Sequence, residues 1–182
     1  YRNSPLGVVA VTVSGMITST IFSMGPVYAR LSGLDTAGVA SFMAVSILSG
    51  TLTQYPMGRL SDRMDRRTVI AIVCTIATFA AGSIVVFPHM PHFLFLTLAG
   101  VFSAFVLTLY SLAVSHVNDK LEPGQMVAAS GALLSLNGTA AAISPILAGS
   151  LLAWLGPRSY FETLAILTGT LTIYDLWRKL RQ

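Results

Sequence analysis

The sequence predicts an all-α membrane protein, built as a bundle of six transmembrane helices. Of its 182 residues, 54% are hydrophobic and only 10% are charged, and the mean hydropathy is +0.73. A soluble domain carries roughly 25% charged residues, so 11 basic and 7 acidic side chains are too few to cover a water-exposed surface of this size. The basic residues cluster between apolar runs, which indicates orientation in a bilayer and argues against nucleic-acid binding.

Six segments are long and apolar enough to cross a hydrocarbon core of roughly 30 Å, which needs about 20 residues. Asp35 is placed to cap the start of the second segment, and Pro88 and Pro91 separate the third from the fourth. The fifth is longer than a bilayer requires, which predicts a tilted helix, and Gly156-Pro157 ends it. In chain order the segments cover residues 5–29, 36–57, 68–87, 92–115, 124–154 and 159–177, so that residues 1–182 are expected to form one helical domain.

Lysine and arginine are divided unequally between the two ends of this expected bundle. The end with two cations has Arg30 and Arg158. The end with nine has Arg2, Arg59, Arg63, Arg66, Arg67, Lys120, Arg178, Lys179 and Arg181. Because cytoplasmic loops carry the excess of Lys and Arg, the distribution predicts that both termini are cytoplasmic.

Small residues spaced four apart predict where the helices contact one another closely. The pairs are Gly15/Ser19, Ser46/Gly50, Gly100/Ala104 and Gly138/Ala142. The single cysteine, Cys74, lies in an apolar run, so the sequence predicts neither an intrachain disulfide nor a cysteine-based metal site.

The densest charge cluster lies in the expected turn between the second and third helices. It reads Gly58-Arg59-Leu60-Ser61-Asp62-Arg63-Met64-Asp65-Arg66-Arg67. This segment strongly resembles the signature of the major facilitator superfamily (MFS): a glycine, any residue, leucine, a small residue, Asp-Arg, two further residues and two basic residues. Its place between the second and third helices also agrees, whereas Asp65 stands where the family usually has glycine.

The physical chemistry of this segment predicts a conformational latch. Gly58 allows another helix to approach its backbone closely, and Asp62 at a helix boundary favours the positive N-terminus of a partner helix. The nearby Arg63, Arg66 and Arg67 either hold Asp62 in place or anchor the loop to anionic lipid headgroups.

The resemblance extends along nearly the whole chain, most closely to a little-characterised bacterial branch of the superfamily. The residues that carry it are Tyr110, His116-Val117-Asn118-Asp119, Ser130-Gly131, Leu133-Leu134, Gly138 and Pro145. The resemblance implies the C-terminal half of a twelve-helix transporter, a 3+3 inverted repeat located in a bacterial inner membrane. In such a half the first and fourth helices line the cavity, the second and fifth flank it, and the third and sixth face lipid.

Candidate substrate contacts are polar and aromatic residues at mid-membrane depth, because transporter sites lie near the midplane between repeats. Asn137 shares a helical face with Ser130, although a hydrogen bond to a neighbouring helix is an equal alternative for its amide. The other candidates are Ser14, Thr18 and Phe22 in the first helix and Phe105 in the fourth. His116 and Asp119 are candidates for gating, although a histidine at a membrane surface is more often solvated.

Charged residues are absent from the central third of every span, where proton relays normally need them. Glu162 and Asp175 lie near helix ends, where snorkelling explains them. An intramembrane hydrolase is disfavoured, because Ser130 lacks the glycine two residues before a protease-type serine and Asp175 has no second intramembrane aspartate. The sequence therefore predicts a non-enzymatic secondary transporter half, without metal or cofactor, that moves a small solute by alternating access together with a second half. The alternative is a membrane interaction module or a half-transporter that works as a homodimer.

Overall fold

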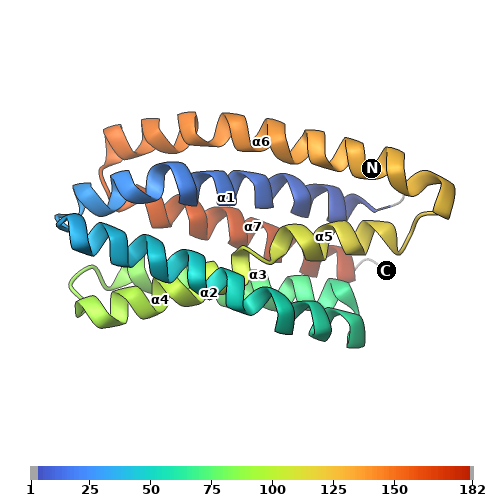
Figure 1. Ribbon diagram of the computed structural model, residues 1–182, viewed down its shortest axis with the longest axis horizontal. Helices are drawn as coiled ribbons and strands as arrows, with labels where there is room; N and C mark the ends of the chain where they lie inside the picture. The colour runs from blue at the N-terminus through green and yellow to red at the C-terminus, as the bar shows by residue number, and fades with distance from the viewer. Residues whose placement is uncertain (1–3, 181–182) are drawn as a thin grey trace.

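The regular secondary structure is entirely helical in the computed structural model, which describes residues 4–180 (Figure 1). Consecutive long helices run antiparallel and form one bundle. The elements are α1 (Pro5–Leu31), α2 (Thr36–Arg63), α3 (Arg66–Val86), α4 (His92–Val106), α5 (Leu109–Asn118), the 3-10 turn η1 (Pro123–Gln125), α6 (Met126–Leu155) and α7 (Ser159–Leu180). The all-α fold class is therefore confirmed.

Five helical segments have the length and hydropathy of membrane spans: α1, α2, α3, α4 together with α5, and α6. The sixth expected span, α7, is not among them, because it contains four threonines as well as Glu162 and Asp175. It nevertheless packs along α3 and α1 over the length of the bundle (Figure 1).

Local side-chain chemistry explains where α2 and α3 begin. The Asp35 carboxylate accepts a hydrogen bond of 2.8 Å from the Gly38 N–H, which confirms it as the cap of α2. Asp65 caps α3 in the same way, accepting from the Thr68 N–H at 3.1 Å and from the Thr68 hydroxyl at 3.0 Å. With φ at −58°, Asp65 needs no glycine-like backbone, so the departure from the family signature is compatible with a tight turn.

The fourth expected span is interrupted between Val106 and Leu109. Thr108 closes a local turn there, donating from its hydroxyl to the Phe105 carbonyl at 2.7 Å. At the same level Leu107 packs against the bare backbone of Gly50 on α2, where an added Cβ would lie 3.0 Å from the Leu107 Cβ. The close approach of α2 to the α4–α5 junction thus depends on a glycine in the predicted Ser46/Gly50 pair.

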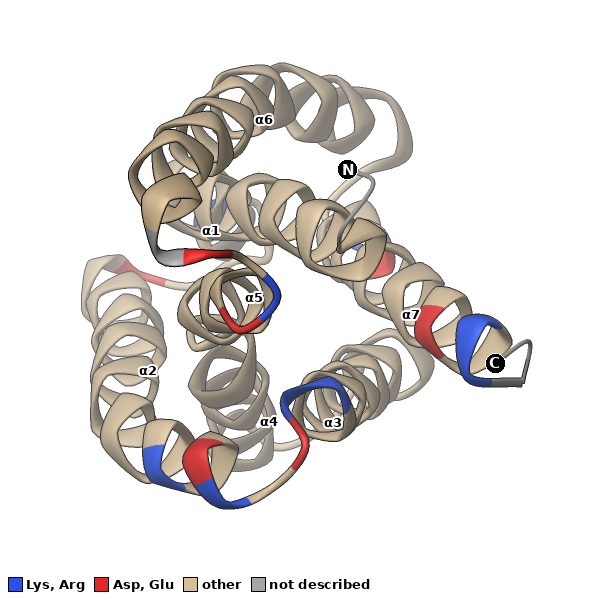
Figure 2. Ribbon diagram, turned by 90° about the vertical axis from the view of Figure 1, so that its right-hand side faces the viewer, with Lys and Arg blue, Asp and Glu red and all other residues tan. Residues whose placement is uncertain are grey.

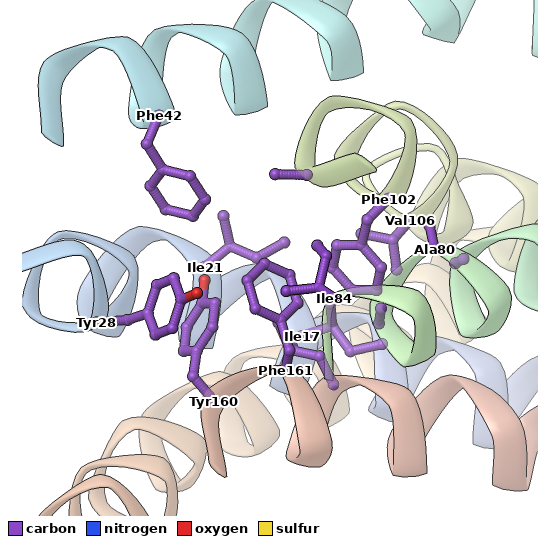
Figure 3. Packing of buried hydrophobic residues seen from close by; sticks show 14 of the residues in the cluster. Ile17, Ile21, Tyr28, Phe42, Ala80, Ile84, Phe102, Val106, Tyr160 and Phe161 are labelled. Atoms are coloured by element: carbon purple, nitrogen blue, oxygen red, sulfur yellow. The ribbon is translucent and has the colours of Figure 1, made fainter. Parts of the chain in front are cut away.

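Two clusters of buried apolar residues fill the bundle, and α1 contributes to both. The first is rich in aromatic rings (Figure 3): Tyr28 stacks on Tyr160 with 4.6 Å between centroids, and Phe161 meets Tyr28 edge-on at 5.2 Å. The second lies toward the α2–α3 turn and includes Val11, Val69, Ile70, Leu109, Leu112 and Leu171. Because it supports both clusters, α1 is the central helix of the fold.

The helices α2 and α6 are the least covered. Only 17% of the apolar window is buried in each, against 50% in α1. Gly138 and Ala142 lie on the exposed face of α6, and nothing lies within 4 Å of a Cβ placed on Gly138. The expected helix contact at this pair is therefore wrong within the described residues, whereas Gly15, Gly50 and Gly100 do contact neighbouring helices.

Candidate functional site

Asn137 on α6 makes its hydrogen bonds to α1. Its amide nitrogen donates to the Val11 carbonyl at 3.0 Å and to the Ser14 hydroxyl at 3.2 Å. The backbone of Asn137 also approaches Gly15 so closely that a Cβ on Gly15 would overlap it. Of the two expected partners for this amide, the structure shows the neighbouring helix.

The same contact between α1 and α6 continues for two more turns. Ser144 donates to the Met16 carbonyl at 3.0 Å and shares a 2.8 Å hydrogen bond with the Thr20 hydroxyl. Ser19 donates to the Ala141 carbonyl at 2.6 Å. That carbonyl is four residues before Pro145, which has no N–H to offer it. The hydroxyl of one helix thus replaces the donor that proline removes from the other.

A cavity of about 410 Å³ opens beside this contact, between α1, α2, α6 and the α4–α5 junction. Its volume lies within the range of small-molecule sites, roughly 300–1,000 Å³. The polar side chains that line it are Thr18, Ser19, Thr51, Gln54, Tyr110 and Asn137. Among residues 4–180, no group of three or more His, Cys, Asp or Glu side chains is placed to hold a metal ion.

The candidate substrate residues fall into two sets. Thr18, Phe22 and Asn137 line the cavity. The other three lie outside it: Ser14 is buried behind Asn137, Phe105 packs on the second apolar cluster, and Ser130 is exposed near the start of α6.

Gln54, Thr51 and Tyr110 also line the cavity, although the sequence reasoning did not single them out as cavity contacts. A signal was present on α2, because Ile47, Thr51 and Gln54 follow the four- and three-residue spacing of one helical face. The sequence predicted only a cap and a small-residue contact pair for this segment.

The signature residues form an ionic cluster at one end of the bundle (Figure 2). Most of them belong to the last turns of α2, which extends to Arg63 rather than ending at residue 57. Asp62 is 69% exposed and pairs with Arg66 at 3.3 Å, and Arg66 in turn contacts Asp119 at the end of α5 at 2.5 Å. Arg66 therefore joins the ends of three helices. Gly58 is exposed, with nothing within 4 Å of an added Cβ.

Asp65 lies in the same cluster, in the turn between α2 and α3. Partial burial acts to raise the pKa of its carboxyl, but the hydrogen bonds donated by Thr68 hold that pKa below its ordinary value. The capping carboxylate is therefore charged at neutral pH, as a helix N-terminus favours.

Arg67 pairs with Asp175 across α3 and α7. The Nε to Oδ1 distance is 2.6 Å, and a terminal nitrogen of Arg67 donates to the Asp175 carbonyl at 2.8 Å. Asp175 is only 2% exposed. The expectation that Asp175 snorkels toward water is therefore wrong: it is a buried anion with a cation brought to it by the neighbouring helix.

His116 is also buried, at 5% exposure, and its Nε2 has no hydrogen-bond partner among the described residues. The alternative of a solvated surface histidine is therefore wrong. Asp65, Asp119, Lys120 and Asp175 are the charged residues around it.

The seven described cations of the more basic end lie together in the structure, at the α2–α3 turn and at the ends of α5 and α7 (Figure 2). The remaining two, Arg2 and Arg181, lie outside the described residues. The opposite end of the bundle has Arg30, in the last turn of α1, and Arg158, between α6 and α7.

Comparison with known proteins gives a consistent result. The chain matches the family profile of the Major Facilitator Superfamily over residues 2–181. It is 31% identical over 133 residues to proteins named "Uncharacterized MFS-type transporter YcaD" from Salmonella paratyphi B, Salmonella newport and Salmonella heidelberg. In each case the match covers 73% of this chain and 34% of the relative. The matched region thus spans about a third of the length of these relatives.

Proposed function

The chain belongs to the major facilitator superfamily, and from this we propose that it is the C-terminal half of a secondary transporter that moves a small solute by alternating access. Membership supports an integral membrane transporter, and a non-enzymatic role is part of the proposal. A second six-helix half completes the transport unit, because one bundle walls the substrate path on one side only.

The main structural support for this proposal is the cavity of about 410 Å³. It is bordered by α1, α2, α6 and the α4–α5 junction, and α2 and α6 are the helices whose outer faces are least covered. A partner that packs along α2 and α6 would close the cavity from the open side. The N-terminal half of the same transporter is the proposed partner, and a second copy of this chain is the alternative.

Within the cavity, Thr18, Phe22, Thr51 and Gln54 are the proposed substrate contacts. The Asn137 amide nitrogen is already bound to α1, so its role there is to position the cavity wall.

The latch is proposed at the end of α2. Arg66 joins Asp62 to Asp119, so that the ends of α2, α3 and α5 move as one body. The exposed Gly58 and Asp62 are the surface that a helix of the other half approaches. Arg63 is the last residue of α2, Arg67 lies in the first turn of α3, and His116 is buried near the end of α5. The nine-to-two distribution of cations supports a cytoplasmic location for this end, in a bacterial inner membrane.

Two-sided labelling tests alternating access without requiring a known substrate. In the complete twelve-helix protein, Thr18→Cys should react with a membrane-impermeant maleimide added from either side, because each conformation exposes the cavity in turn. The native Cys74 is buried and gives little background. Ile173→Cys, on an exposed apolar position of α7, should react from neither side. Reaction of Thr18→Cys from one side only would contradict alternating access.

The latch is tested in the same assay. Asp62→Asn keeps the shape of the side chain and removes the charge that favours a partner helix terminus, worth about 0.3 to 1 kcal/mol. The ratio of outer to inner labelling at residue 18 should therefore change by about two- to fivefold. An unchanged labelling ratio would indicate that Asp62 is only a solvated surface residue and not part of a latch. A chain that forms a stable dimer alone and labels from both sides would favour the homodimer.

A further inference from the structure

A second groove, of about 230 Å³, is lined by residues of α3 and α7. In Figure 2 these two helices lie apart from α2 and α6, which border the cavity. Apolar side chains form the walls of the groove, and cations lie at one end. The wall residues are Ala71, Ile72, Thr75, Ile76 and Leu176, and the cations are Arg67 and Lys179. Beyond the groove the two helices meet directly, where the Thr78 hydroxyl donates to that of Thr168 at 2.9 Å.

An ion pair holds the charged end of the groove in a defined geometry. The buried Asp175 carboxylate holds the Arg67 guanidinium in place at 2.6 Å. Lys179 is exposed one helical turn further along α7, so the charged residues of the groove lining are two cations and one carboxylate. Thr75 donates its hydroxyl to the Ala71 carbonyl at 2.7 Å, which leaves its methyl group to the groove. The groove therefore combines an apolar wall with a net positive end.

Aromatic residues indicate the depth of this end in the bilayer. Tyr174 and Trp177 stack with 6.4 Å between ring centroids, beside Lys179 on α7. Tryptophan and tyrosine concentrate at the headgroup level of membranes. Ile72 and Leu176 are exposed apolar side chains of the groove wall. The cations thus lie at the level of lipid phosphates and the wall at the level of acyl chains.

We propose that this groove binds a phospholipid, with its phosphate against Arg67 and Lys179 and one acyl chain along the α3 wall. From Thr68 to Ile76 the wall is about 12 Å long, at 1.5 Å per residue. The groove is smaller than the 300 Å³ lower bound for solute pockets, which suits part of an acyl chain better than a transported molecule. The site goes beyond the proposed transport function and does not depend on it.

Fluorescence quenching tests the site in the complete protein that contains this chain, with any tryptophan outside the chain replaced by phenylalanine. Trp154→Phe removes the tryptophan at the far end of the bundle and leaves Trp177 beside the groove. In detergent micelles, phosphatidylglycerol with a brominated acyl chain should quench Trp177 at a lower mole fraction than brominated diacylglycerol, which lacks the phosphate.

Matched variants locate the binding. Lys179→Gln should weaken phosphatidylglycerol quenching about fivefold, the effect of one lysine near a membrane surface. Arg178→Gln, which removes a neighbouring cation outside the groove lining, should change it less than twofold. Ala71→Phe fills the groove and should abolish the preference for phosphatidylglycerol, while Ile173→Phe, outside the groove lining on α7, should leave it intact.

Three results would overturn the proposal. Equal quenching by diacylglycerol and phosphatidylglycerol would show that the groove takes up any acyl chain. Equal weakening by Lys179→Gln and Arg178→Gln would show a diffuse surface charge effect, and Ala71→Phe with undiminished preference would place the lipid elsewhere.

Discussion

Pro145 illustrates how a single residue in α6 depends on another helix. Inside a helix, proline withholds a donor from the carbonyl four residues earlier. Here that carbonyl belongs to Ala141, and the Ser19 hydroxyl of α1 donates to it at 2.6 Å. An unpaired carbonyl in a lipid-like interior is costly, so the two residues should be energetically coupled.

Ser19→Ala is expected to lower the free energy of unfolding by about 0.6 kcal/mol, and at most about 1.7 kcal/mol, the range measured for hydrogen bonds between membrane helices. In a Pro145→Ala background the cost should shrink, because the restored N–H can bond to the Ala141 carbonyl. The measurement is a double-mutant cycle from unfolding in mixed micelles. Ser23→Ala is the control, since that hydroxyl bonds within α1. The same cost in both backgrounds would disprove the coupling.

Asn137→Ala should also lower stability by about 0.6 to 1.7 kcal/mol, because it removes the amide that joins α6 to Val11 and Ser14. The melting temperature of the purified protein is the measurement. Thr139→Ala, two residues along on the exposed face of α6, should have little effect, because its hydroxyl bonds to its own helix. A variant that weakens substrate binding at unchanged stability would instead make Asn137 a direct substrate contact.

At the scale of elements, α3 and α7 are joined by charge at one end. Replacing one partner of a buried ion pair leaves the other uncompensated, which costs about 3–5 kcal/mol. Asp175→Asn should therefore destabilise the protein strongly, since Asp175 is buried against Arg67. Glu162→Gln is the matched control on the same helix: its pair with Arg158 is exposed, and exposed pairs contribute about 0–1 kcal/mol. Thermal unfolding distinguishes them, and equal effects would contradict the assigned burial.

The ends of the elements show what the sequence can and cannot predict. Asp35 was predictable as a cap because one residue type at one position before an apolar run is a local signal. Burial of Asp175 was not, because it depends on α3 bringing Arg67 beside α7, a contact between positions 108 residues apart. The interruption at Thr108 was hidden for a similar reason: residues 92–115 contain no proline and no Asp, Glu, Lys or Arg, and the break accompanies packing of Leu107 on Gly50.

At the scale of the whole molecule, hydropathy and charge counting were sufficient for the fold class and the superfamily signature identified the family. The cavity was only partly predictable. Thr18 and Asn137 are polar side chains in clearly apolar spans and were therefore conspicuous. Gln54 lies near the end of the expected span 36–57, and it lines the cavity only because four segments pack together.

Topology is the prediction that belongs to this scale. Met64→Cys in the α2–α3 turn should react with an impermeant maleimide only from the cytoplasmic side, and His89→Cys in the α3–α4 turn only from the outside. Both native side chains are exposed, and the native Cys74 is buried. Labelling of intact cells and of inverted vesicles supplies the two measurements. Reaction of Met64→Cys in intact cells would show that the α2–α3 turn lies outside and that the predicted orientation is wrong.

The contact between α1 and α6 has a consequence for biosynthesis. Its partners lie 122 to 128 residues apart, and a ribosome adds about 5–20 residues per second. After α1 is made, about 6 to 26 s therefore pass before α6 exists. Serine and threonine tolerate this delay, because a hydroxyl can bond to the carbonyl four residues earlier in its own helix, as Ser23 does. A carboxamide has two donors and an acceptor oxygen, more than one carbonyl of its own helix can satisfy, and Asn137 is on the later helix. Asn137 is therefore synthesised after its acceptors on α1, the Val11 carbonyl and the Ser14 hydroxyl, are already in the membrane.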